Sequence, residues 1–190
     1  MSKFISITGL FFGLMGAFSA FSQTNPLVDN IVTHTIAVQI PAVGLVNVIG
    51  TQDVNLTLNN PAEAGLGLSN TISDSSFWLN YSFIKGGGTR PYNHVYAKIV
   101  NGVIPLGISL SVYAKPYQGS GLGLFGTPTG KVLLNYNEAR VVENISSCFT
   151  GVGPGNGHQL VYQLQLIPNA YHLLDYEQPQ QLSVMYTISD

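Results

Sequence analysis

Residues 76–83 read Ser-Phe-Trp-Leu-Asn-Tyr-Ser-Phe, and this stretch decides the fold class. Every second residue from Phe77 to Phe83 is large and apolar, and the residues between them are polar except for Trp78. A period of two is typical of a half-buried antiparallel strand, because successive side chains of a strand point to opposite faces. The stretch therefore predicts a strand with one face in a core and Trp78 on the other face.

The same alternation recurs along most of the chain, and no stretch after residue 22 keeps the 3.6-residue period of a helix. Groups rich in glycine, proline and asparagine lie between the alternating stretches, as is typical of turns. We therefore expect an all-β fold, an antiparallel β-sandwich of nine or ten short strands with immunoglobulin-like or jelly-roll-like wiring. The clearest expected strands are residues 34–40, 53–58, 77–83, 95–99, 108–115, 132–136, 160–166 and 182–188.

The first 22 residues have the layout of a secretory signal peptide. Lys3 precedes an apolar run from Phe4 to Ala17, and small residues follow it. The run is too short for a comfortable membrane span. We expect cleavage after Ala20 or Ser22, so residues 1–22 form the signal peptide and residues 23–190 form one exported domain with no transmembrane segment. The protein would then act in the periplasm, on the outer surface or outside the cell.

The content of charged residues limits the kinds of partner that the chain can bind. Only 8% of the 190 residues are charged, about a third of the usual share. Removing Lys3 from the seven basic residues leaves six against nine acidic ones. No basic cluster is present, and nucleic-acid binding needs several cations to neutralise phosphates. We therefore expect no nucleic-acid partner.

Two glycine-rich runs superficially resemble nucleotide-binding loops. Gly121 to Gly126 has the spacing of a dinucleotide fingerprint, but Thr127-Pro-Thr129 follows where that mechanism needs a helix. Gly126 to Lys131 lacks the glycine spacing of a P-loop. A third run, Gly151 to Gly157, is interpreted as a long loop of the kind that carries binding surfaces. We predict no cofactor.

The chain shows no pattern that predicts catalysis or metal binding. The four histidines are far apart in sequence, and a structural hydrogen-bonding role is expected for each: His34, His94, His158 and His172. The acidic residues are also scattered, and no nucleophile elbow is present. We therefore predict a protein that is not an enzyme, with no catalytic, cofactor-binding or metal-binding residue.

Several aromatic residues fall on polar-facing or loop positions. They are Trp78, Tyr92, Tyr96, Tyr113 and Tyr117. Exposed aromatic rings beside asparagine are suited to stacking and hydrogen-bonding sugar rings. Trp78, Tyr96, Tyr113 and Tyr117 are therefore the candidate ligand-binding residues. The alternative is that the sheet is covered on both faces and that Trp78 packs in the core.

The single cysteine, Cys148, cannot form an internal disulfide, so packing must hold the exported domain together. We interpret it as a buried thiol at the end of a strand, since free cysteine is among the most buried residue types. A covalent dimer through Cys148 is the alternative.

Five segments together resemble exported proteins of Bacteroidota that have no assigned activity. They are the signal peptide, Thr35-Ile-Ala-Val-Gln-Ile-Pro41, Ser76 to Ser82, the loop from Gly151 to His158 and Val184-Met-Tyr-Thr-Ile-Ser189. The chain is also loosely similar to pilin-like and adhesin-like surface sandwiches, by architecture alone. The pilin-like resemblance implies a sandwich that a neighbour's N-terminal strand completes. Residues 31–40 would be either that donor or the protein's own first strand.

These observations predict a secreted or cell-surface protein with a structural or adhesive role, such as a filament or surface-layer subunit. Its partners would be other copies of itself or cell-surface proteins, and glycans are a further candidate. The second hypothesis is a carbohydrate-binding module that uses the exposed Trp and Tyr residues, and a hydrolase ranks last.

Overall fold

The computed structural model describes residues 33–50, 53–88, 91–177 and 181–190. The chain divides into two units, residues 1–39 and residues 40–190. The described residues of the first unit, 33–39, contain no helix or strand. In the described ranges every strand belongs to the second unit, where a 3₁₀ turn, η1 (Tyr171–Leu173), is the only helix. That helix is too short to cross a membrane, and the described residues contain no other candidate span.

The second unit is built from two antiparallel sheets. The larger sheet contains β1 (Val43–Ile49), β2 (Thr71–Ile84), β4 (Ile108–Ala114), β5 (Leu122–Gly123), β7 (Val132–Leu133), β9 (Cys148–Phe149) and β10 (His158–Leu166). The smaller sheet contains β3 (Asn93–Asn101), β6 (Thr127–Pro128), β8 (Ala139–Ile145) and β11 (Ser183–Ser189). The strand order is β5-β9-β2-β10-β4-β7 in the larger sheet, where β1 also pairs with β2, and β11-β3-β8-β6 in the smaller one.

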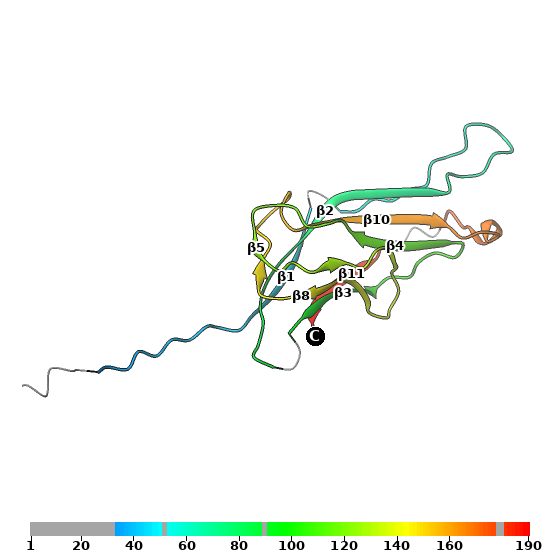
Figure 1. Ribbon diagram of the computed structural model, residues 1–190. Coiled ribbons are helices and arrows are strands. Elements are labelled where there is room, and N and C mark those ends of the chain that lie inside the picture. Colours follow the sequence, from blue (N-terminus) through cyan, green and yellow to red (C-terminus); the bar gives the residue numbers. More distant parts are fainter. Residues whose placement is uncertain (1–32, 51–52, 89–90, 178–180) are drawn as a thin grey trace, which may run out of the picture. The chain divides into compact units, whose positions relative to one another are not determined.

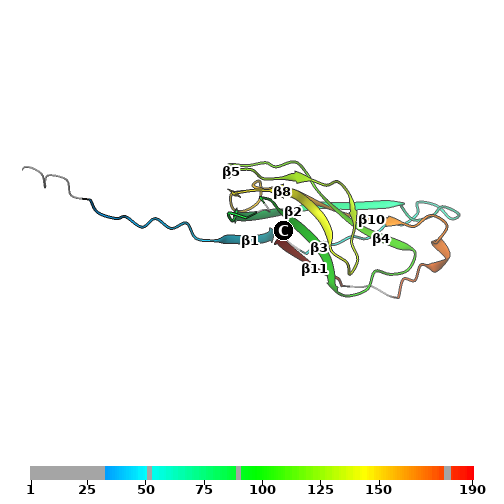
Figure 2. The same ribbon diagram turned by 60° about the horizontal axis from the view of Figure 1, so that its bottom comes forward.

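The two sheets pack face to face around one core. Figure 1 shows β2, β10 and β4 in one layer and β3, β8 and β11 in the other, and Figure 2 shows the same layers from another side. Most of the longer strands contribute alternate residues to the core, whereas β8 contributes two adjacent valines. The fully buried side chains include Leu79, Val112 and Leu160 from the larger sheet and Val95, Val141, Val142 and Ile145 from the smaller one. The prediction of an all-β fold of antiparallel sheets is confirmed.

Two of the expected strands are absent. Residues 34–40 form no strand, and the first strand of the described chain begins at Val43. Val43 pairs with Ile84, the last residue of β2, so β2 has no further residue to pair with the chain before Val43. Residues 53–58 also form no strand. Val54 and Leu56 nevertheless pack against the core, so the alternation in this segment reflects burial without strand pairing.

Candidate interaction surface

An exposed row of apolar side chains crosses the outer face of the larger sheet. Ser82 of β2 pairs with Leu45 of β1 on one side and with Phe149 of β9 on the other. Phe149 pairs in turn with Leu122 of β5. Directly paired residues of antiparallel strands project from the same face. The four side chains therefore form one row across four strands, in which three apolar residues flank one serine. We call it the apolar row: Leu45, Ser82, Phe149 and Leu122.

The apolar row is open to solvent. Leu45 is 67% exposed, Phe149 48% and Leu122 68%. The next outward-facing pair, Val43 and Ile84, lies alongside. Scattered apolar residues on a surface are ordinary, but a contiguous patch indicates an interaction site.

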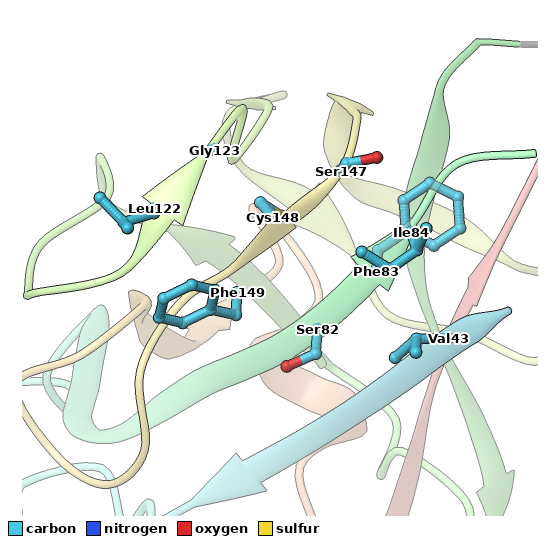
Figure 3. Close-up of a pocket in the computed structure, with 9 residues that line it drawn as sticks. All are labelled: Val43, Ser82, Phe83, Ile84, Leu122, Gly123, Ser147, Cys148 and Phe149. Atoms are coloured by element: carbon cyan, nitrogen blue, oxygen red, sulfur yellow. The ribbon is translucent and has the colours of Figure 1, made fainter. Parts of the chain in front are cut away.

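A shallow hollow of about 420 Å³ adjoins three residues of the apolar row, Ser82, Phe149 and Leu122. Figure 3 shows the residues that line it. Its lining contains no charged residue: Val43, Ser82, Phe83, Ile84, Leu122, Gly123, Ser147, Cys148 and Phe149. A surface of this kind can bury apolar area against a partner, but it offers no acid, base or cation for chemistry. The arrangement therefore suits association with an apolar partner.

Cys148 lies at the edge of this hollow without presenting a reactive thiol. The residue is 6% exposed, and burial raises the pKa of its thiol to about 11. The thiolate is the nucleophilic form of cysteine, so this thiol is unreactive near neutral pH. The prediction that Cys148 is buried is confirmed.

A loop covers the outer face beside the apolar row. The side-chain amide of Asn80 donates to the carbonyl of Asn156, and the Gly153 N–H donates to Oδ1 of Asn80 at 3.1 Å. The loop of residues 151–157 is thereby held over Asn80, which is buried. The sequence interpretation of Gly151 to Gly157 as a loop is confirmed, and its placement limits the apolar row to one end of β2.

The glycines of the false dinucleotide motif have a packing role. Gly123 and Gly126 have φ angles of 114° and 77°, in the region that favours glycine. A Cβ at Gly123 would collide with the Ser147 carbonyl, and one at Gly126 would collide with the Glu143 carbonyl. These glycines therefore let the chain lie close against β8 and β9, and β6 follows them where a dinucleotide site needs a helix.

The four predicted ligand-binding residues do not come together. Trp78 and Tyr113 lie on the outer face of the larger sheet, on β2 and β4, with β10 between these strands. Tyr96 lies on the smaller sheet, where the Arg140 guanidinium is 5.6 Å from its ring centre. Tyr117 lies in the segment after β4 and stacks on Phe125. The four candidates therefore lie on three different parts of the fold, and only Trp78 and Tyr113 share a face.

The structure contains a buried hydrogen-bonded centre around His158, which has the structural hydrogen-bonding role expected from the sequence. His158 is fully buried, with its Nδ1 2.8 Å from the Lys115 carbonyl and its Nε2 2.8 Å from the Tyr81 hydroxyl. The Tyr81 hydroxyl also donates to the Phe125 carbonyl. The centre thus ties β10 and β2 to the segments around residues 115 and 125. The sequence indicated the role of His158 but not its partners, because Tyr81 and Lys115 are distant from it in the chain.

Burial dominates the electrostatics of this centre. It lowers the pKa of His158, and the Lys115 and Phe125 carbonyls oppose that shift by favouring the protonated ring. Burial also raises the pKa of Tyr81 well above its usual value. Both side chains are therefore neutral at physiological pH. No three His, Cys, Asp or Glu residues in the described ranges lie close enough together to hold a metal ion.

Comparison of the chain with protein-family models, curated proteins and solved structures finds no match in any of the three.

Proposed function

We propose that this chain is an exported structural or adhesive protein of the bacterial cell surface that associates through the apolar row. It would carry residues 1–22 as a signal peptide, keep immunoglobulin-like or jelly-roll-like wiring and have no enzymatic activity. The observation that carries the proposal is that exposed Leu45, Phe149 and Leu122 lie in one row across paired strands, beside a hollow with an uncharged lining.

The edges of the sheets support the same proposal. The edge strands β1 and β11 are each seven residues long, and neither contains a charged residue or a proline. Charges and prolines at an edge strand discourage pairing with another chain. Their absence from both long edges favours a protein that makes contacts with copies of itself or with other surface proteins.

A second candidate function is glycan binding on the outer face of the larger sheet. Gln159 of β10 pairs with Trp78 and hydrogen-bonds Lys115, while the neighbouring Val161 pairs with Tyr113. The face thus combines two half-buried aromatic rings with an amide and an ammonium group. Quenching of Trp78 fluorescence by added glycans, and its loss in Trp78→Ala, would favour this candidate.

A cell-adhesion assay tests the first candidate. Cells that export the wild-type chain should aggregate or attach to a surface more than cells without it, and Leu122→Asp should abolish the gain. Val103→Asp is the matched control, because Val103 is also a largely exposed aliphatic residue but does not line the hollow. Equal adhesion with Leu122→Asp and the wild type would contradict the proposal, as would retention of the wild-type chain in the cytoplasm.

A further inference from the structure

A second groove lies beyond Gly123, between the segment that links β5 to β6 and the ends of two strands of the smaller sheet. Its lining residues are Tyr92, Tyr117, Gly123, Leu124, Phe125, Gly126, Thr127 and Asn144. We call it the aromatic groove. Its volume is about 580 Å³, which falls within the range of small-ligand sites.

The aromatic part of this groove is rigid. The rings of Phe125 and Tyr117 stack with their centres 3.5 Å apart, and the planes differ by 12°. The Tyr117 hydroxyl accepts from the Gly121 N–H at 2.6 Å and donates to the Thr150 carbonyl at 3.2 Å. Tyr92 adds a third ring, which is 45% exposed. Rings that are already fixed lose little conformational freedom when a ligand stacks on them.

The polar part of the groove has hydrogen-bonding groups without protein partners. Across the described ranges, the side chains of Tyr92, Thr127 and Asn144 make no hydrogen bond. Asn144 has a φ of 60°, and its backbone N–H donates to Nδ1 of His94. The backbone of Asn144 is thereby fixed, while its exposed amide remains able to donate and to accept.

The absence of charged residues from the lining of the groove favours neutral ligands. None of its eight lining residues is charged, so an anionic or cationic ligand would lose hydration without gaining a counter-charge. A purely apolar ligand would leave the Thr127 hydroxyl and the Asn144 amide unpaired. A pyranose ring fits both conditions, because it has an apolar C–H face for an aromatic ring and a rim of hydroxyl groups for an amide and hydroxyls.

We propose that the aromatic groove binds a neutral saccharide, with a sugar ring against Tyr92 and hydroxyl groups hydrogen-bonded by Asn144 and Thr127. This goes beyond the proposed association through the apolar row and does not depend on it. The aromatic groove is also distinct from the outer face of the larger sheet, where the second candidate function places glycan binding, since Trp78 does not line the groove.

An NMR titration of the ¹⁵N-labelled exported protein tests the proposal. The probes are methyl glucoside, methyl galactoside, methyl mannoside and N-acetylglucosamine, with glucuronic acid as an anionic counterpart of glucose. At least one neutral probe should give saturable shifts of the backbone amides of Gly126, Thr127 and Asn144. Glucuronic acid should bind at least about tenfold more weakly than that probe.

Three variants test whether the saccharide binds in the aromatic groove. Tyr92→Ala should weaken binding about tenfold, and Asn144→Gly, which tolerates the positive φ, should weaken it several-fold. Tyr176→Ala, at a tyrosine that is 92% exposed and outside the groove, should leave the affinity unchanged. The proposal is overturned if no neutral probe binds, if glucuronic acid binds as well as the neutral probe, if the shifts map to Trp78, or if both groove variants bind like the wild type.

Discussion

The Tyr81 hydroxyl lies 2.8 Å from Nε2 of His158, and both side chains are buried in the core. The Nδ1 of His158 faces the Lys115 carbonyl, which can only accept, so Nδ1 carries the proton of the neutral ring. Nε2 is then an acceptor, and the Tyr81 hydroxyl is the donor that faces it. The Phe125 carbonyl faces the same hydroxyl, so the single proton of Tyr81 is shared between two buried acceptors.

Tyr81→Phe should therefore destabilise the fold. The change removes a hydroxyl and leaves Nε2 of His158 and the Phe125 carbonyl without that donor. We expect the free energy of unfolding to fall by about 1–3 kcal/mol, measured by urea denaturation. Tyr136→Phe is the matched control, because the Tyr136 hydroxyl bonds a carbonyl at an exposed position, and its effect should stay within about 0.5 kcal/mol. Equal losses in the two variants would contradict this role for Tyr81.

The stability of the protein should fall in mildly acidic solution. The pKa of His158 is lowered in the folded state by burial, so folding favours the neutral ring. The contribution is complete above the unfolded-state pKa of about 6.5 and is lost as the pH falls from there through the folded-state pKa. The pKa of His94 is also lowered, by burial and Arg140, and contributes with the same sign.

Denaturation at several pH values below 7 should show this loss, and a His94→Asn background would isolate the part that comes from His158. An NMR titration of the His158 ring gives its folded-state pKa directly, whether or not a His158 variant folds. A pKa above 6.5 for this ring would contradict the account.

Cys148 should resist modification in the folded protein. Its thiol is buried and its pKa is raised to about 11. A thiol reagent at pH 8 should label less than one tenth of the protein on a timescale that labels unfolded protein fully. Rapid labelling of the folded chain, or a disulfide-linked dimer on a non-reducing gel, would contradict this expectation.

Two glycines with similar backbone conformations should respond differently to alanine. Gly126 and Gly130 have φ angles of 77° and 93°. A Cβ at Gly126 would meet the Glu143 carbonyl and the Ile145 side chain, whereas one at Gly130 would meet no atom within 4 Å. Gly130→Ala should cost about 1–2 kcal/mol from its conformation, and Gly126→Ala about 1–3 kcal/mol more from collision. Thermal denaturation measures both, and equal costs would contradict the close packing of Gly126.

The exported chain should lack its first residues. N-terminal sequencing of protein recovered outside the cytoplasm should begin at Phe21 or Gln23, after cleavage behind Ala20 or Ser22. An intact N-terminus on exported protein would contradict the signal-peptide prediction.

Regular alternation predicted most of the long strands correctly. It missed β8, however, and it wrongly predicted a strand at residues 34–40. Residues 77–83 place one clear apolar stripe in the core, as expected. The strand β8 escaped prediction because Val141 and Val142 are adjacent and both buried, and its Asn144 has a positive φ, so the period of two is broken. Residues 34–40 alternate but form no strand, since pairing depends on a partner that alternation cannot reveal.

The candidate surfaces could not be predicted from the sequence either, because they depend on which strands and loops lie side by side. Leu45, Phe149 and Leu122 are far apart in sequence, and only the register of β1, β2, β9 and β5 brings them into one row. Tyr117 is expected at a polar-facing or loop position, but the sequence does not indicate that it stacks on Phe125, which lies in a glycine-rich run. The contact between Tyr81 and His158 joins residues 77 positions apart.

If the apolar row is an association surface, the protein should self-associate, and light scattering after gel filtration measures its molar mass in solution. The molar mass of the wild-type chain should rise with concentration, while Phe149→Asp should remain a monomer of unchanged circular dichroism at every concentration. The control Val103→Asp should associate like the wild type. A wild-type chain that stays monomeric at the highest concentration, or a Phe149→Asp variant that associates equally well, would contradict the account.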